Sequence, residues 1–149
     1  MVLEQTFVMV KPDGVERGLV GECIKRLEQV GLKMIGIKMA WVNEEFSRKH
    51  YREDIARRRG ESVRNKLVQY ITHGPVVALA VEGVDAIAVV RKITGDTEPA
   101  KALPGTIRGD FAHGNIPHAN TLEKPVMNLI HASSDQQDAQ TELALWFSK

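Results

Sequence analysis

The feature that most constrains the fold is an unbroken apolar run, VVALAV at residues 76–81. Gly74 and Pro75 precede the run, and Glu82 and Gly83 follow it, so it is bounded by turn residues and too short for an ordinary helix. A strand that is apolar at every position is typical of the centre of a sheet with both faces covered. The rest of the chain is therefore expected to supply neighbouring strands and two layers of helices.

Three further runs are rich in β-forming residues and predict the neighbouring strands: TFVMVK at 6–11, LKMIGIKMAW at 32–41 and VMNLIH at 126–131. The turn residues Pro12, Asp13 and Gly14 end the first strand. The second run is apolar at both parities, which predicts that both faces of the sheet are at least partly covered.

Apolar residues recur at helical spacing between these strands. They predict helices over 19–27, 62–71 and 86–93 and from about Asp135 to Phe147. A further helix is predicted to begin after Asn43 and run toward Tyr51, and the charged residues that follow Tyr51 are expected to be helical as well. The order of elements favours a ferredoxin-like βαββαβ fold of the α/β (α+β) class, with a four-stranded antiparallel sheet and covering helices. No repeat or linker divides the chain, so we expect a single domain over residues 1–149.

The segment from Thr94 to Lys124 has no apolar periodicity and is interrupted by glycines and prolines. It predicts a long irregular loop, and such a loop inside a compact domain is usually functional.

Composition excludes several classes of protein. The 20 Lys and Arg residues nearly balance the 19 Asp and Glu residues, so nucleic acid is an unlikely main partner. The single cysteine, Cys23, excludes an internal disulfide and a cysteine-rich zinc site. No apolar run approaches the ~18 residues of a membrane span, and no basic-plus-apolar leader precedes Lys11, so we expect a cytoplasmic protein without a membrane partner. One local excess stands out: residues 48–66 carry a net charge of +5.

Three cations are placed where they could hold a polyphosphate. Lys11 ends a strand before a rigid turn, Arg91 interrupts an apolar helix, and Arg108 lies in the glycine-flanked PGTIRGD segment. Lys11 and Arg91 are equally compatible with exposed surface positions, and Arg108 with an arginine that holds its own loop through Asp110. The chain has no phosphate-binding glycine loop, so side chains would have to bind the phosphates.

His131 is the histidine best placed for chemistry, because it ends an apolar strand just before a helix start. Glu142 lies ~60° from Ala139 and ~40° from Trp146 around that helix, at the edge of its apolar stripe. The short connection can bring Glu142 and Ser133 near the imidazole, where a carboxylate would orient it. A structural histidine bonded to backbone is the alternative.

Five segments form long and specific motifs: TFVMVKPDGVERGLVG at 6–21, GPVVA at 74–78, PGTIRGDF at 104–111, NLIHAS at 128–133 and ELALWF at 142–147. In this order they resemble the nucleoside diphosphate kinases over nearly the whole chain. The resemblance implies a ping-pong exchange in which a nucleoside triphosphate such as ATP phosphorylates His131 and a nucleoside diphosphate then takes the phosphoryl group.

The same resemblance implies roles for individual residues. Glu142 and Ser133 match the residues that position the histidine, and Tyr51 matches a tyrosine near the transfer site. The residues that match the family's phosphate and ribose ligands are Lys11, Arg91, Thr97, Arg108 and Asn128. The resemblance also implies Mg²⁺ as the cofactor, held by the nucleotide phosphates and not by protein ligands. It further implies a homo-oligomer, either a hexamer or a tetramer, with contacts between subunits at residues 94–105.

The chain departs from the family pattern near the base. Val63 and Arg64 stand where the family usually has a Phe-Phe pair, so base stacking is expected from Val63 with Leu67. The segments around residues 57–59 and 112–127 are longer than the corresponding segments of typical family members. Ala132 stands at a position where many family members have glycine.

Two other functions are open to the sequence. A ferredoxin-like sheet can bind single-stranded RNA, but the chain has only eight Phe, Trp and Tyr residues and its predicted strands hold few of them. A degenerate relative that acts only as an assembly partner is the second alternative, and the retained His131, Glu142 and three cations argue against it.

Overall fold

The sheet has four strands in the order β2-β3-β1-β4, and every adjacent pair is antiparallel. The computed structural model describes residues 3–148. Its strands are β1 (Leu3–Val10), β2 (Lys33–Ala40), β3 (Val76–Val84) and β4 (Ile130–Ala132). The predicted ferredoxin-like α+β fold is confirmed, with the apolar run at 76–81 in an inner strand as expected.

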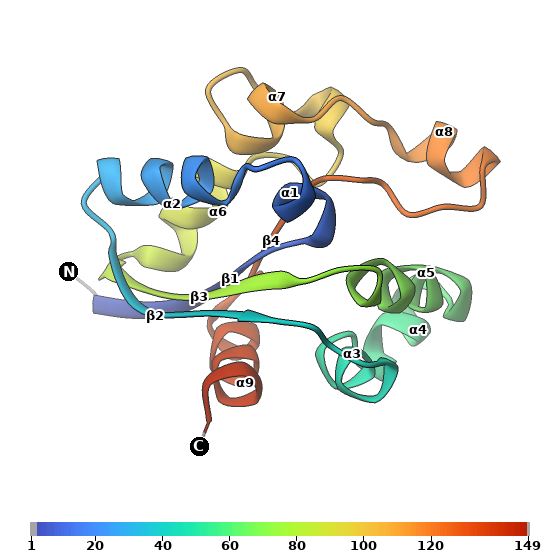
Figure 1. Cartoon of the computed structure of the whole chain (residues 1–149), viewed down its shortest axis with the longest axis horizontal. Helices are drawn as coiled ribbons and strands as arrows, with labels where there is room; N and C mark the ends of the chain where they lie inside the picture. Colours follow the sequence, from blue (N-terminus) through green and yellow to red (C-terminus); the bar gives the residue numbers. More distant parts are fainter. Residues whose placement is uncertain (1–2, 149) are drawn as a thin grey trace.

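Helices cover both faces of the sheet (Figure 1). Their bounds are α1 (Pro12–Glu16), α2 (Val20–Gln29), α3 (Glu44–His50), α4 (Glu53–Arg59), α5 (Glu61–Thr72), α6 (Ala86–Thr94), the short 3₁₀ helix η1 (Pro99–Lys101), α7 (Ile107–Phe111), α8 (Ile116–Thr121) and α9 (Gln136–Phe147). Local signals fix several ends: Asn43 Oδ1 accepts from Phe46 N at 2.8 Å, and Asp135 Oδ1 accepts from Asp138 N at 2.8 Å.

Two cores lie on opposite faces of the sheet because side chains alternate along β1. Val8 and Val10 pack with residues of α2 and α6, whereas Phe7 and Met9 pack with α5 and α9. Figure 1 shows α2 and α6 on one side of the sheet and α3 and α9 on the other. Phe7 is completely buried, so the aromatic ring of this central strand offers no stacking surface to RNA.

The stretch from Thr94 to Lys124 is less irregular than predicted, since it contains η1, α7 and α8. Thr106 Oγ1 accepts from Gly109 N at 3.0 Å to start α7, and Asn115 Oδ1 accepts from His118 N at 2.7 Å to start α8. Helices of five or six residues are too short to produce apolar periodicity, and for this reason the sequence prediction missed them.

Two predicted details were wrong. Pro12 opens the short helix α1 and not only a turn, as proline can at a first helical position. The last strand begins at Ile130 instead of residue 126, because Leu129 has a left-handed backbone (φ +56°) that a strand cannot contain. Both faces of the sheet carry helices (Figure 1), as expected, although the edge strand β2 leaves Ile37 and Met39 56% and 63% exposed in the single chain.

Within residues 3–148, none of the helices combines the length and the hydropathy that a membrane span requires.

Candidate active site

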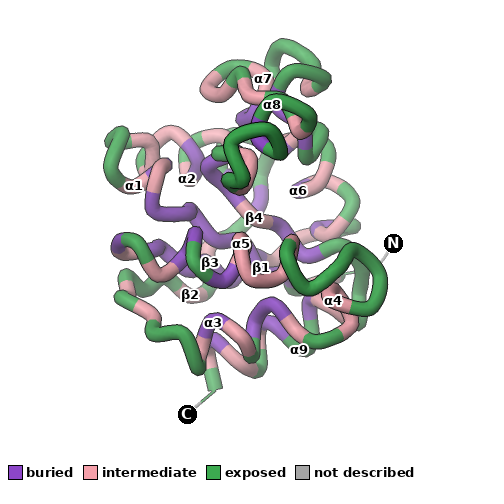
Figure 2. Tube along the Cα trace, turned by 90° about the vertical axis from the view of Figure 1, so that its right-hand side faces the viewer, coloured by how far each residue is buried: buried purple, intermediate pink, exposed green. Residues whose placement is uncertain are grey.

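A cavity of about 310 Å³ opens beside β4, with α4 and α5 on one side and α8 on the other. Figure 2 shows α4 and α8 as largely exposed segments, whereas much of β1, β3 and β4 is buried. The structure brings nine sequence-predicted residues to its wall: Lys11, Tyr51, Val63, Arg91, Thr97, Arg108, Asn128, His131 and Glu142. Ser133 is buried behind the wall and reaches the site through Glu142.

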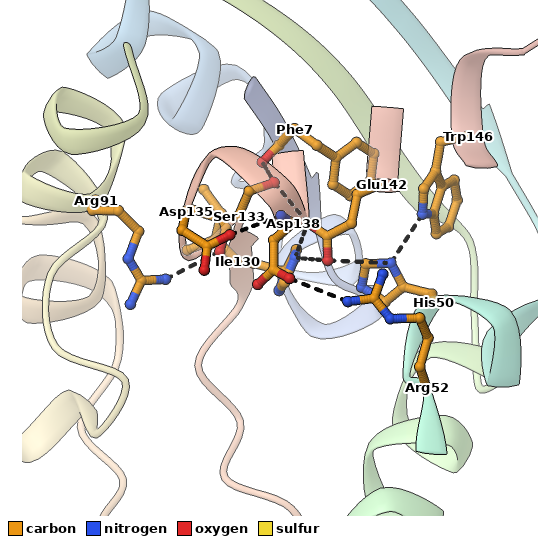
Figure 3. Close-up of polar contacts among 12 residues, drawn as sticks. Phe7, His50, Arg52, Arg91, Ile130, Ser133, Asp135, Asp138, Glu142 and Trp146 are labelled. Carbon is orange, nitrogen blue, oxygen red and sulfur yellow. Dashed lines mark hydrogen bonds and ion pairs between the residues drawn. The ribbon is translucent and has the colours of Figure 1, made fainter. Parts of the chain in front are cut away.

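His131 is held by the carboxylate of Glu142 in the last helix, α9, and Figure 3 shows how Glu142 lies between Ser133 and His50. Its Nε2 lies 3.0 Å from Glu142 Oε1 and 3.1 Å from Oε2. Ser133 Oγ donates to Glu142 Oε1 at 2.6 Å. Because β4 leads directly into α9, the strand and the helix fold back on each other and bring these three residues together.

Electrostatics determine which imidazole nitrogen is free. Burial alone would raise the pKa of Glu142, but the charge of His131 and hydrogen bonds from His131 and Ser133 lower that pKa to about 2. An ionised carboxylate only accepts hydrogen bonds, so the neutral imidazole carries its proton on Nε2. No hydrogen bond among residues 3–148 occupies Nδ1, and His131 lines the cavity. The arrangement therefore leaves a nitrogen lone pair available for attack.

His50 and Trp146 complete this side of the site and were not assigned to it from the sequence. The rings of His50 and His131 pack edge to face, with centroids 4.7 Å apart and planes at 80°. Trp146 Nε1 donates to His50 Nδ1 at 3.0 Å (Figure 3). Spacing gives no signal for either residue, because three separate elements, α3, β4 and α9, converge here.

The buried His50 ring is uncharged at ordinary pH. Burial, followed by the nearby charge of His131, lowers the pKa of His50 to about 3. Since Trp146 can only donate, the single proton of His50 lies on Nε2, which is buried without a partner among residues 3–148. A neutral neighbour adds no positive charge beside His131.

Lys11 is buried at the inner end of the cavity, only 5% exposed, and not a solvated strand-end lysine. Its Nζ donates to Asn128 Oδ1 at 2.8 Å, and Asn128 Nδ2 donates to the backbone oxygen of Thr97 at 2.9 Å. Burial and the nearby Arg108 lower the pKa of Lys11 to about 7. An incoming anion would favour its charged form.

Arg108 is also buried and does not hold its loop through Asp110. Its guanidinium donates to the backbone oxygens of Gly95 (3.1 Å), Asn128 (3.3 Å) and Ile130. Burial lowers the pKa of Arg108 to about 10, so it stays charged at neutral pH. Asp110 instead pairs with Arg26 at 2.7 Å.

Arg91 reaches the cavity from α6 and donates to the backbone oxygen of Ala132 at 3.0 Å. Figure 3 shows its side chain extending toward β4. Together with Lys11 and Arg108, Arg91 gives the inner end of the cavity three cations on three different elements. This arrangement suits a ligand with several negative oxygens.

The outer part of the cavity is different in character. Val63 and Leu67 of α5 are half-buried and line one wall, and Ile116 and Val126 line the opposite wall. The ring of Tyr51 is buried between the two ends, and its hydroxyl has no hydrogen-bond partner among residues 3–148. The outer walls could enclose a flat apolar group.

Three possible metal ligands lie close together in the site. His50, His131 and Glu142 place ligand atoms within 4.8 Å of one another. His131 and Glu142 already bond to each other, and Trp146 donates to His50. His131 Nε2, His50 Nδ1 and the Glu142 carboxylate are therefore engaged, whereas His131 Nδ1 and His50 Nε2 have no hydrogen-bond partner among residues 3–148.

Comparison with known proteins identifies relatives over nearly the full length. Residues 4–149 match the family model described as nucleoside diphosphate kinase. A nucleoside diphosphate kinase from Borreliella burgdorferi is 47% identical over 148 residues, which cover 99% of this chain and 89% of the relative. One from Archaeoglobus fulgidus is 51% identical over 146 residues, with coverages of 98% and 87%.

Two solved structures superpose closely. A transition-state mimic of nucleoside diphosphate kinase from Borrelia burgdorferi, with bound vanadate and ADP, has a TM-score of 0.97 and 47% identity and covers 100% of this chain and 89% of that one. An NDP kinase from Pyrobaculum aerophilum has a TM-score of 0.91 and 31% identity, with coverages of 99% and 97%.

Proposed function

The chain belongs to the nucleoside diphosphate kinase family of enzymes, and we propose that it transfers the γ-phosphoryl group of a nucleoside triphosphate to a nucleoside diphosphate through a phosphohistidine at His131. The observation that carries the proposal is the bonding of His131: Glu142 takes Nε2 and leaves Nδ1 without a hydrogen bond among residues 3–148, and the ring lines a cavity that Lys11, Arg91 and Arg108 also line. The likeness to a relative solved with ADP and vanadate supports it.

In the first half-reaction, the lone pair of His131 Nδ1 attacks the γ-phosphorus. The N–P bond forms as the bond from phosphorus to the β,γ-bridging oxygen breaks, and a nucleoside diphosphate leaves with that oxygen. The ring becomes cationic as the N–P bond forms, and the ionised Glu142 stabilises that charge.

In the second half-reaction, a terminal β-phosphate oxygen of another nucleoside diphosphate attacks the phosphorus. The N–P bond breaks, its electron pair returns to Nδ1, and His131 is again neutral. The same residues serve both directions, as expected for an exchange between chemically similar substrates.

Lys11, Arg91 and Arg108 would hold the phosphates during both half-reactions. Phosphoryl transfer is catalysed by positioning and by positive charge around the transferred oxygens, and these buried or half-buried cations are fixed before substrate arrives. Asn128 and Thr97 lie beside Lys11 and would bond phosphate or ribose oxygens. Tyr51 lies next to the transfer site.

Mg²⁺ is the proposed cofactor, and the lining indicates how it would be held. The three carboxylates in the cavity wall are engaged: Asp54 with Arg52 and Arg58, Asp138 with Arg52, and Glu142 with His131. We therefore propose that the nucleotide phosphates and water hold the ion. Mg²⁺ bound there would offset phosphate charge.

The base would lie in the outer part of the cavity against Val63 and Leu67. An apolar wall stacks on any base, so this proposal implies a broad choice of nucleoside. A homo-oligomer is also proposed, and the exposed apolar residues of β2, including Ile37 and Met39, support it because such an edge favours pairing. A hexamer or tetramer, a single domain over residues 1–149 and a cytoplasmic location stay predictions.

Labelling tests the proposed function. The protein incubated with γ-labelled ATP and Mg²⁺ is expected to acquire acid-labile, base-stable label, and unlabelled GDP is expected to discharge it. His131→Ala should remove the label. His113→Ala is the matched control, because His113 is exposed outside the cavity lining and its loss should leave labelling unchanged. Full labelling of His131→Ala would contradict the assignment.

A further inference from the structure

Leu129 has an unusual backbone at a sensitive place. Its φ is +56°, a left-handed value that is unfavourable for a residue with a Cβ. Ile130 N donates to Asn128 O at 2.7 Å across it, so Leu129 is the centre of a three-residue turn of a rare and strained kind. The turn joins Asn128 directly to the strand that carries His131.

Such a turn persists only when its surroundings hold it. Asp13 Oδ2 accepts from Leu129 N at 3.2 Å, and Leu129 O accepts from Lys11 N at 2.9 Å. Arg108 binds the two flanking carbonyls, those of Asn128 and Ile130. Both backbone polar groups of Leu129 and the two flanking carbonyls are thus engaged.

Asp13 is itself fixed from a second direction. Tyr70 OH donates to Asp13 Oδ1, which leaves Oδ2 directed at Leu129. Gly14 next to it allows close contact, because a Cβ there would lie 2.8 Å from Leu129 O. Asp13 is not among the residues that line the cavity, and the mechanism above does not use it.

We propose that Asp13, braced by Tyr70, is a positioning residue that holds the Leu129 turn and so keeps Asn128 and His131 in register with the phosphates. The turn is the only covalent link between these two site residues, so its relaxation shifts one relative to the other. The proposal rests on the proposed transfer at His131. Displacements near 1 Å can cost about 10²-fold in rate, so a relaxed turn is enough to impair transfer.

Two substitutions of Asp13 separate its hydrogen bond from its charge. Asp13→Ala removes the acceptor of Leu129 N–H and is expected to slow labelling of His131 by about 10- to 100-fold. Asp13→Asn is the matched control, because it also removes the charge near Lys11 but keeps an oxygen acceptor. It is expected to slow labelling much less. Equal losses in the two variants would overturn the proposal in favour of a charge effect on Lys11.

A second comparison tests the strain at Leu129. Leu129→Ala and Leu129→Gly remove the same buried side chain, but only glycine adopts a positive φ without strain. Asp13→Ala is expected to slow labelling strongly in the alanine background and little in the glycine background. An equal response in both backgrounds would overturn the proposal.

Amide hydrogen exchange on Asp13→Ala alone gives a readout that needs neither Leu129 variant to fold. The Leu129 and Ile130 amides are expected to lose protection while β1 and β3 keep theirs. Unchanged protection at Leu129 would contradict the proposal. This outcome is separable from failure of the proposed function, which would appear as absence of histidine label in the unsubstituted protein.

Discussion

The two ends of the cavity are built differently. At the inner end, Lys11, Arg108 and Asn128 are 3–5% exposed and bond to one another or to backbone. At the outer end, α4 has no buried residue and α8 buries only Ala119. The inner end is therefore fixed in advance, whereas the outer end rests on short, exposed helices with few anchors.

The difference matches what the proposed function would require of each end. Charge stabilisation depends on groups held rigidly in a dry environment, because reorganisation and water weaken it. Contact with a base needs only an apolar surface of suitable width. One cavity can thus combine rigidly held charged groups at its inner end with an outer end that accepts different bases.

The basic stretch at residues 48–66 belongs to the outer end. Arg48 pairs with Glu44 at 2.9 Å and Arg58 with Asp54 at 3.1 Å, so part of its charge is locally compensated. Arg59 and Lys66 line the cavity. The stretch therefore forms part of the rim of the cavity, and the proposed function explains its charge better than a separate nucleic-acid patch does.

The largest expected effect on the rate of labelling comes from substituting Arg108 at the inner end of the cavity. Arg108→Ala should reduce the rate of His131 phosphorylation by about 10³-fold, the magnitude typical of an arginine that stabilises a transferring phosphoryl group. It should also lower the free energy of unfolding by ~2 kcal/mol, because three buried carbonyls lose a charged donor. Quench-flow labelling and denaturant unfolding measure the two effects. A rate within threefold of normal would contradict a role for this guanidinium.

Glu142→Gln should have the next largest effect, about 10²-fold in labelling rate, because an amide cannot balance the charge that His131 gains. It should also change stability with pH. The pKa of Glu142 is depressed in the folded state, so its contribution is present above about pH 4.5 and is lost as pH falls toward 2. The stability difference between the two proteins should therefore shrink on acidification, as thermal unfolding at pH 3 and pH 6 can measure.

Proton uptake by Lys11 on ligand binding provides a further test of the inner end of the cavity. Its pKa of about 7 in the free protein means that the amine is largely neutral above pH 7, and bound phosphates favour the charged form. ADP binding at pH 8 should therefore take up close to one proton, and affinity should fall as pH rises from 7 to 10. Calorimetry in buffers with different ionisation enthalpies measures this uptake. Lys11→Met should abolish it, and uptake that survives the substitution would assign the proton to another group.

The smallest effect is expected at the outer end. Val63→Ala should raise KM for nucleotides only about three- to tenfold, since it removes little apolar area from a half-buried wall. The rate at saturation should stay unchanged, because Val63 is remote from His131 chemistry. Steady-state kinetics with ATP and with GTP as donors would test both statements. A large drop in kcat would mean that the two ends are not independent.

Much of this organisation is present in the sequence itself. The apolar run at residues 76–81 and its neighbours predict the sheet, because strand patterns depend on adjacent residues. The sequence also places Lys11 and His131 at the ends of strands and Glu142 at the edge of the apolar face of its helix, because these positions follow from neighbouring residues. The family motifs then name these residues as one site.

Other features were decided only by the tertiary structure. His50 lies against His131, and Asp13 bonds to Leu129 across 116 positions of sequence. The left-handed turn at Leu129 contradicts its local preference and exists because Asp13, Lys11 and Arg108 hold it. Local preference and periodicity cannot predict such contacts, since their free energy comes from groups that meet only after the chain has folded.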